Sequence, residues 1–265
     1  MNSICSYGQP LTDDLALWRD LGVDHVALIL PKIEELGWSE SRARVTDAGL
    51  RVSTIFGPTY RPLDADPALG WRAEDQAGTD QTLELAAAIG AGSVYICTGA
   101  ATSMAWDDAA EAFCEFLAPS VTLADSLGVP LLLEPTNPMR IDVSFVFWQR
   151  DAMDLARQAG TKVMLDFQSC WYERGLEQVV RDNIDLVGVA QLSDYVVGTA
   201  QTGNRVVPGD GDIPLERLVT MALDAGFEGT FDLEVMGPRI EEEGYPAAVR
   251  RAVERAGELL DRLGA

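Results

Sequence analysis

The sequence predicts a single-domain (β/α)8 TIM barrel that spans residues 1–265. Three observations favour this fold. Amphipathic segments alternate with short apolar runs rich in β-branched residues, which is typical of a parallel sheet covered by helices. The hydrophobic content of 47% supplies a full core, and no linker or low-complexity segment divides the chain. Eight strand–helix units also fit the length of the chain.

The strand predictions follow from apolar runs that begin shortly after a glycine. Such a glycine is the residue expected just past a helix end, because it adopts positive φ without steric cost. Six turns carry one, at Gly22, Gly49, Gly90, Gly128, Gly160 and Gly226. The expected strands are Ser3–Ser6, a run ending at Leu30, Val52–Phe56, Ser93–Cys97, Leu131–Glu134, Val163–Asp166, Leu186–Leu192 and Phe231–Glu234.

Amphipathic segments between these strands predict the outer helices. The clearest are Asp80–Ile89, Trp106–Leu127, Phe147–Ala159, Pro214–Ala225 and Pro246–Leu263. A doubly wound open sheet is the alternative architecture. It requires a glycine-rich phosphate-binding turn after the first strand, where this chain has only Cys5-Ser-Tyr-Gly8-Gln9.

Composition limits the classes of partner. The net charge of −22, from 42 acidic and 20 basic residues, argues against nucleic acid and against an anionic membrane surface. No apolar run reaches the ~18–20 residues of a membrane span, and the first residues do not resemble a secretory signal. We therefore expect a cytoplasmic protein with a small-molecule substrate. The four cysteines form no metal-binding or disulfide pattern, so free thiols are expected.

Four consecutive strands of the predicted barrel end on a residue that can offer oxygen to a metal ion. These residues are Glu134, Asp166, Gln191 and Glu234. Adjacent strands lie ~4.8 Å apart, so four neighbouring strand ends can converge on one ion. Three carboxylates and one amide carbonyl suit Mg²⁺ or Mn²⁺ better than zinc. The alternative is that some of these residues cap helices or pair with arginines at the rim.

The chain resembles the xylose-isomerase-like TIM-barrel superfamily in four stretches, Leu133–Arg140, Leu165–Trp171, Gln191–Asp194 and Arg205–Pro214. That superfamily includes sugar-phosphate isomerases and epimerases, keto-sugar epimerases, inosose dehydratases and dehydroshikimate dehydratases. The resemblance implies one bound divalent metal ion, held by the same four strand-end residues. Gln191 stands where the epimerases usually have histidine, which resembles the dehydroshikimate dehydratase branch.

Two departures from the family pattern concern histidine. Ser169 stands where many relatives carry a histidine that contacts the substrate. The only histidine of the chain, His25, lies at the start of the second predicted strand, where we expect a structural role. Histidine acid–base chemistry is therefore disfavoured. The same departures argue against the apurinic-endonuclease branch and weaken a direct transfer of dehydratase activity.

The resemblance implies roles for the remaining residues. Glu134 and Glu234 would be the catalytic acid–base pair, and Asp166 and Gln191 mainly metal ligands. Substrate contacts are expected from a small group of residues in the loops that follow the strands, namely Arg205, Ser169, Arg140 and Trp171.

The sequence favours an isomerase or epimerase that acts on a keto-sugar, polyol or related hydroxy-carbonyl compound by enolate-type proton transfer. A metal-dependent lyase or dehydratase is the main alternative. A barrel with altered chemistry that serves as a partner subunit stays open as a third. The resemblance further implies a homodimer or homotetramer.

Overall fold

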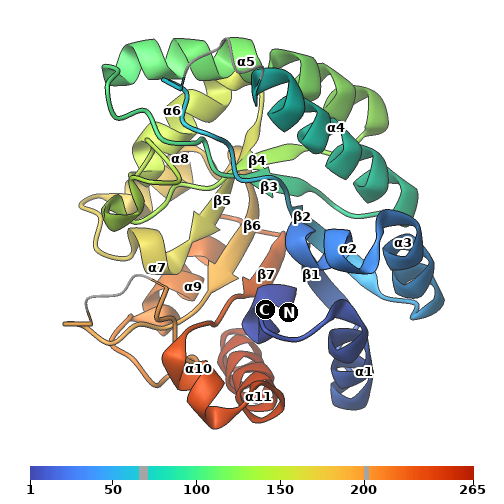
Figure 1. Ribbon diagram of the computed structural model, residues 1–265. Coiled ribbons are helices and arrows are strands. Elements are labelled where there is room, and N and C mark those ends of the chain that lie inside the picture. Colours follow the sequence, from blue (N-terminus) through green and yellow to red (C-terminus); the bar gives the residue numbers. More distant parts are fainter. Residues whose placement is uncertain (66–70, 200–202) are drawn as a thin grey trace.

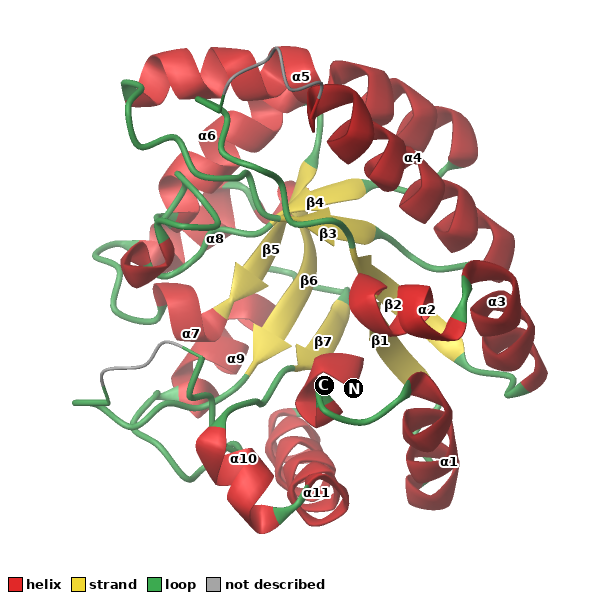
Figure 2. Ribbon diagram, viewed as in Figure 1, coloured by secondary structure: helices red, strands yellow, loops and turns green. Residues whose placement is uncertain are grey.

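Seven parallel strands follow one another around a nearly closed barrel, and helices cover its outside (Figures 1 and 2). The computed structural model describes residues 1–65, 71–199 and 203–265. Each strand pairs with the next strand along the chain, so the expected TIM barrel is confirmed. The strands are β1 (His25–Ile29), β2 (Arg51–Phe56), β3 (Val94–Ile96), β4 (Leu131–Leu133), β5 (Lys162–Asp166), β6 (Val187–Leu192) and β7 (Thr230–Leu233).

Helices precede the first strand, lie in the connections between strands and follow the last strand. They are α1 (Leu11–Leu21), α2 (Leu30–Leu36), α3 (Trp38–Asp47), α4 (Trp71–Ile89), α5 (Trp106–Leu127), α6 (Gln149–Ala159), α7 (Phe167–Cys170), α8 (Leu176–Asp182), α9 (Leu215–Asp224), α10 (Pro238–Glu243) and α11 (Tyr245–Leu263). Helix α5 has the expected bounds, whereas α4 begins at Trp71 instead of Asp80. Gly128 and Gly160 end their helices with φ of 67° and 74°, as the glycine pattern predicts.

The expected opening strand is wrong, because Ser3–Ser6 forms a short 3-10 helix, η1. Two side chains compete with strand pairing here. Asn2 caps the helix by accepting a hydrogen bond from the Ile4 N–H at 3.0 Å, and Ser3 Oγ accepts one from the Ile29 N–H at 2.9 Å. Asn2, just before this segment, makes a strand-like bridge with Ala27 of β1.

Residues 1 and 2 nevertheless close the seam between the first and last strands. The Asn2 N–H donates to the Leu233 carbonyl at 3.1 Å, and the Ala27 N–H donates to the Met1 carbonyl at 2.8 Å. The two residues before η1 therefore occupy the position of the missing eighth strand, at the N-terminal end of the chain between β7 and β1 in Figure 1.

Side-chain alternation along the strands divides the core in two. One large cluster fills the space between sheet and helices and includes Trp18 and Phe113. A smaller cluster fills the barrel interior and consists of Tyr95, Leu132, Met164 and Val189, with Phe56 against it. Because side chains alternate along a strand, the residue two positions further on faces inward again. The alternation thus directs the strand-end residues toward the barrel axis.

Other expectations concern features away from that axis. His25 is exposed and contacts Asp24 Oδ1 at 2.8 Å. It is the first residue of β1, so it lies at the end of the barrel opposite the C-terminal strand ends. All four cysteines are free thiols in the structure. Across the described residues, we find no helix with the length and apolar character needed to span a membrane.

Candidate functional site

The four predicted oxygen donors lie at the C-terminal ends of neighbouring strands. Glu134 and Glu234 directly follow β4 and β7, and their N–H groups continue the strand pairing by donating to Ile96 and Leu192, each at 2.9 Å. Asp166 is the last residue of β5, and it pairs in register with Gln191 of β6. The barrel thus brings residues far apart in the sequence to one end of its axis.

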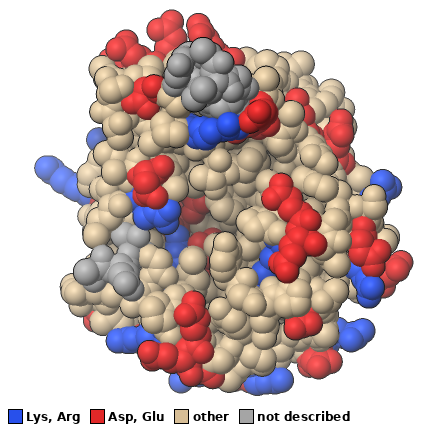
Figure 3. All heavy atoms as spheres, in the orientation of Figure 1, with Lys and Arg blue, Asp and Glu red and all other residues tan. Residues whose placement is uncertain are grey.

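A cavity of about 180 Å³ opens at this end of the barrel. In the space-filling view, acidic and basic atoms are visible in a hollow near the middle of the face (Figure 3). The lining includes the predicted residues Glu134, Glu234, Arg205, Ser169 and Arg140. Apolar and small polar side chains complete it, among them Ile4, Phe56, Thr59, Tyr95, Cys97, Thr136, Asn137, Val143, Gln168 and Met236.

Arg205 holds the carboxylates together at the base of the cavity. Its guanidinium donates to both oxygens of Asp166, at 3.0 and 2.8 Å, and its Nη2 lies 3.4 Å from Glu234 Oε1. A further hydrogen bond of 3.2 Å runs to Ser193 Oγ. Burial acts to lower the pKa of Arg205, but the charges of Asp166 and Glu234 outweigh it and raise the pKa overall.

Gln191 is oriented by two acidic neighbours. Its Nε2 donates to Glu234 Oε2 at 2.5 Å and lies 3.5 Å from Asp232 Oδ2. Asp232 is fully buried and is held in turn by Asn2 Nδ2 at 2.8 Å. Because Nε2 faces the carboxylates, the amide oxygen Oε1 is left buried without a hydrogen-bond partner among the described residues. An unsatisfied buried oxygen is costly unless a donor or a cation reaches it.

The two glutamates titrate in an unusual range. Burial and the nearby charges of Glu234 and Asp166 raise the pKa of Glu134 well above its ordinary value. Burial likewise raises the pKa of Glu234 to about 7, with Arg205 opposing the rise and the charges of Asp166 and Asp232 adding to it. Raised pKa values favour the protonated form of both carboxyls, and for Glu234 the shift brings proton exchange close to neutral pH, which suits acid–base chemistry.

The chemistry of these donor residues fits a divalent cation. In this structure, however, the carboxylates are arranged around the Arg205 guanidinium. Three carboxylates share one arginine charge, so the site carries excess negative charge in a buried place. The unpartnered Gln191 Oε1 adds a neutral oxygen beside them. These are ligands that Mg²⁺ and Mn²⁺ prefer. Within the described ranges, however, no group of three or more His, Cys, Asp or Glu side chains has an arrangement that could hold a metal ion.

The predicted substrate-contacting residues differ in placement. Ser169 donates to Asp166 Oδ2 at 2.5 Å and lines the cavity. Arg140 also lines the cavity, and both oxygens of Asp142 accept hydrogen bonds from it at 3.0 and 3.1 Å. Trp171 is not among the described residues that line this cavity. It packs edge-on against Tyr172, with ring centroids 5.8 Å apart, and lines a separate depression beside α8 and α9.

Several residues of the cavity were not anticipated from the sequence. Cys97 Sγ lies 3.7 Å from Glu134 Oε2, and Tyr95 stacks on Phe56 with ring centroids 4.8 Å apart. Cys97 follows β3 just as Glu134 follows β4, so the strand-end pattern that identified the acids also applies to it. The pattern was applied to oxygen donors, and a thiol is not one of them.

Asp194 does not line this cavity, but it shapes the loop that carries Arg205. Its carboxylate accepts hydrogen bonds from the N–H groups of Gly209, Gly211 and Ile213 at 2.9–3.0 Å, and from that of Tyr195 at 2.8 Å. These contacts fold the β6–α9 connection back over the strand ends.

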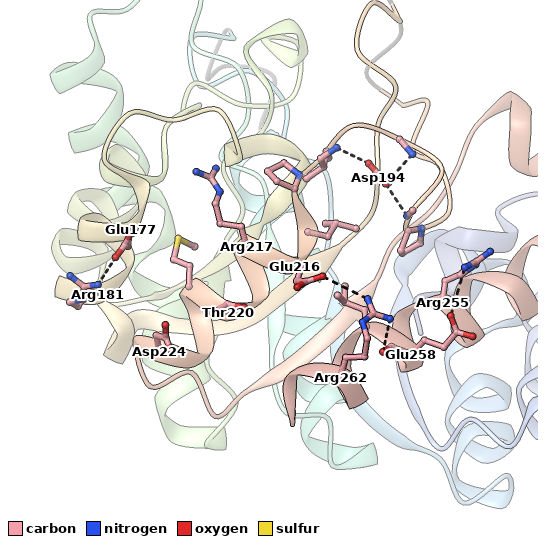
Figure 4. Close-up of a pocket in the computed structure, with 18 residues that line it drawn as sticks. Glu177, Arg181, Asp194, Glu216, Arg217, Thr220, Asp224, Arg255, Glu258 and Arg262 are labelled. Atoms are coloured by element: carbon pink, nitrogen blue, oxygen red, sulfur yellow. Dashed lines mark hydrogen bonds and ion pairs between the residues drawn. The ribbon is translucent and has the colours of Figure 1, made fainter.

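A larger cavity of about 750 Å³ lies outside the barrel, along α8, α9 and α11 (Figure 4). Most of its charged side chains face one another in pairs: Glu177 with Arg181 at 2.6 Å, Glu258 with Arg255 at 3.7 Å, and Glu216 with Arg262 at 4.0 Å. None of the residues predicted from the sequence lines it. The smaller cavity at the barrel mouth, where buried carboxylates converge, is therefore the candidate active site.

Comparisons with known proteins show the same fold over the whole chain. Protein SMc04130 from Sinorhizobium meliloti 1021 superposes with a TM-score of 0.87 at 21% identity, over 98% of this chain and 97% of that one. An IOLI protein with a bound zinc atom gives 0.82 at 14% identity, over 99% and 98%. An L-ribulose 3-epimerase gives 0.79 at 18% identity, over 100% and 94%.

These similarities in structure extend over the whole barrel. No curated protein matches the sequence. Residues 15–256 match the family described as xylose isomerase-like TIM barrel. That span covers most of the chain, including the strand ends that carry Glu134, Asp166, Gln191 and Glu234. The chain therefore belongs to the xylose isomerase-like TIM barrel family.

Proposed function

We propose that the protein is a divalent-metal-dependent isomerase or epimerase acting on a keto-sugar, polyol or related hydroxy-carbonyl compound. One observation carries the proposal most: Glu134 and Glu234, from β4 and β7, line the same buried cavity, and burial raises the pKa of both. Two such carboxyls suit the removal of a proton from a carbon and its return. The volume of about 180 Å³ suits a small molecule.

The residues that would hold the cation are Glu134, Asp166, Gln191 and Glu234. When bound, a divalent ion polarises a carbonyl and the neighbouring hydroxyl and so acidifies the adjacent C–H. We assign the metal as Mn²⁺ or Mg²⁺ from the all-oxygen donor set. Among the similar structures, the IOLI protein holds zinc.

The chain's own residues would then move the proton. Glu134 and Glu234 would form the acid–base pair: one, as the carboxylate, takes the proton from the substrate carbon, and the other, as the carboxylic acid, returns one from the other side of the barrel mouth. Arg205, Ser169 and Arg140 would orient the substrate oxygens by hydrogen bonds. The apolar side chains Ile4, Phe56 and Met236 line the same cavity and limit the access of water.

The test combines metal analysis with proton exchange. Protein loaded with Mn²⁺ is incubated in D₂O with a panel of keto-sugars and cyclic keto-polyols, and deuterium at the carbon beside the carbonyl is followed by NMR. We expect exchange together with interconversion of isomers. Replacing Glu134→Gln should lower the exchange rate by ~10²–10⁴, because a neutral amide cannot accept the proton.

Glu173→Gln is the matched control, since Glu173 is also a partly buried glutamate whose pKa is raised, yet it does not line the cavity. Its exchange rate should equal that of the wild type. Loss of water from the substrate would identify a lyase instead. Bound metal without exchange across the whole panel would contradict the isomerase proposal.

A further inference from the structure

Asp166 has no free acceptor site in this structure. Its Oδ1 accepts from the Gln168 N–H at 3.0 Å and from Arg205 Nη1 at 3.0 Å. Its Oδ2 accepts from Ser169 Oγ at 2.5 Å and from Arg205 Nη2 at 2.8 Å. A carboxylate offers about four lone-pair sites. A cation that binds Asp166 must therefore displace one of these donors.

Arg205 is the donor that can leave most readily. The Gln168 N–H is fixed in the backbone at the start of α7, where Asp166 is the helix cap. Ser169 is nearly fully buried, at 2% exposure, and its hydroxyl sits three residues from Asp166 on the same turn. Arg205 instead reaches Asp166 from the loop after β6 on a long side chain with many rotamers.

The backbone of Arg205 is anchored, so only its side chain needs to move. Its N–H donates to the Met236 carbonyl at 2.8 Å, and the Met236 N–H donates back at 3.2 Å. The next residue, Val206, pairs with Asp194 in the same antiparallel manner. Arg205 also lines the cavity of about 180 Å³, so its guanidinium has space to turn away from Asp166 without a change in the fold.

The charges of the site favour such an exchange. Arg205 contributes one positive charge to three carboxylates, those of Glu134, Asp166 and Glu234. Among the described residues, the Glu134 side chain makes one hydrogen bond, a weak contact from the Cys97 thiol at 3.7 Å. A divalent ion at the carboxylates, with Arg205 retained in the cavity, would bring the local charge to zero. Buried charge is least costly when it is compensated in this way.

We propose that Arg205 and a divalent cation compete for Asp166, so that Arg205 sets the metal affinity of the site and turns into the cavity toward the substrate when the ion binds. The inference rests on the cation of the proposed function. It differs from a permanent arginine–aspartate pair, in which Arg205 would support the metal site or leave its affinity unchanged.

The test measures the affinity of metal-free protein for Mn²⁺ by isothermal titration calorimetry. Arg205→Gln removes the competitor, and we expect binding to tighten by about 10-fold or more, equivalent to about 1.4 kcal/mol. Arg205→Lys keeps the charge but cannot bridge both oxygens of Asp166, so its affinity should also rise, by a smaller factor. The lysine variant also keeps the test informative if Arg205→Gln fails to fold.

Arg140→Gln is the matched control. It removes an arginine charge from the lining of the same cavity without touching Asp166, because Arg140 pairs with Asp142. Competition predicts a change of less than about 2-fold there. The proposal would be overturned if Mn²⁺ affinity rose equally in Arg140→Gln and Arg205→Gln and stayed unchanged in Arg205→Lys. That result would reveal a general effect of charge.

A second readout follows the side chain itself. Arginine labelled with ¹⁵N gives an Nε signal for Arg205 that is assigned by its loss in Arg205→Lys. Addition of diamagnetic Mg²⁺ should shift this signal and leave that of Arg140 in place, whereas an unmoved Arg205 signal at saturation would refute the exchange. If neither wild type nor variants bind Mn²⁺ or Mg²⁺, the proposed function fails as well. If wild type binds and the Arg205 variants bind no tighter, only the competition fails.

Discussion

Burial disfavours the charged form of the Glu173 carboxyl, and its hydrogen-bond partner offsets this only in part. It accepts a hydrogen bond from the Gln149 N–H at 2.7 Å, at the start of α6. Burial and the charge of Asp151 nevertheless raise its pKa from 4.5 to about 7. Because the folded-state pKa lies above the unfolded one, protonated Glu173 favours the folded state, and this contribution is lost as pH rises from about 4.5 to about 7.

Replacing Glu173→Gln should therefore stabilise the protein above pH 7. Glutamine keeps the acceptor for the Gln149 N–H and carries no charge, so we expect a gain of roughly 1–2 kcal/mol at pH 8, after allowance for partial exposure. The gain should shrink toward pH 5. Urea denaturation at both pH values measures it, with exposed Glu84→Gln on α4 as the control. A gain that did not depend on pH would contradict this account.

At the residue scale, the sequence predicted that the acids of the candidate site lie at strand ends but not which side chains they contact. Glu134 and Glu234 could be identified because an apolar strand rarely ends on a carboxylate without a reason. The pairing of Arg205 with Asp166 depends on a loop that folds back between Asp194 and Met236, and no local pattern encodes that path. The placement of Trp171 away from the cavity depends likewise on the short turn of α7.

At the scale of elements, η1 closes the barrel through Asn2. Its Oδ1 caps η1, while Nδ2 donates to Asp232 at 2.8 Å and lies 3.4 Å from Tyr95 Oη. Replacing Asn2→Asp keeps the cap but places a second carboxylate against buried Asp232. We expect the free energy of unfolding to fall by roughly 3 kcal/mol near neutral pH, as measured by chemical denaturation.

The control for this substitution is Asn137→Asp. Asn137 caps another 3-10 helix, η3 (Pro138–Arg140), by accepting from the Met139 N–H at 3.0 Å. Aspartate caps about as well as asparagine, so a change below about 0.5 kcal/mol is expected there. Similar losses in the two variants would show that capping, and not the contact with Asp232, governs the stability of the seam.

Element boundaries were predictable where glycine and amphipathic patterns coincide. Helix α5 begins at Trp106 and ends at Leu127, before Gly128, as the sequence indicates. The predicted strand at Ser3–Ser6 failed because the cap by Asn2 and the Ser3–Ile29 contact are local side-chain effects that hydrophobic periodicity does not register. The parallel strand order followed from the alternation of elements alone.

For the whole molecule, the dominant feature is negative charge. The net charge of −22 is spread over a surface on which acidic side chains recur (Figure 3). Mutual repulsion of like charges destabilises a compact state, and salt screens it. We expect the melting temperature to rise by roughly 2–5 °C between 0.05 and 0.5 M NaCl in calorimetric scans.

A charge-reduced variant provides the comparison. Glu84 and Glu254 are exposed on α4 and α11, and neither makes a recorded ion pair in the described structure. Replacing both with lysine should reduce the gain from salt. A melting temperature that stays flat in the wild type over this range would show that the acidic shell is already screened or well paired.

Both oxygens of Asp166 already have hydrogen-bond partners, and this affects how a newly synthesised chain folds. Small metal domains leave their ligands without partners until an ion arrives, so their folding waits on metal supply. Here Arg205, Ser169 and the Gln168 N–H satisfy the aspartate from within the chain. The newly synthesised barrel can therefore complete its fold before it meets any ion. Under the proposed function, a finished cavity, and not an unfolded chain, would then select the metal ion.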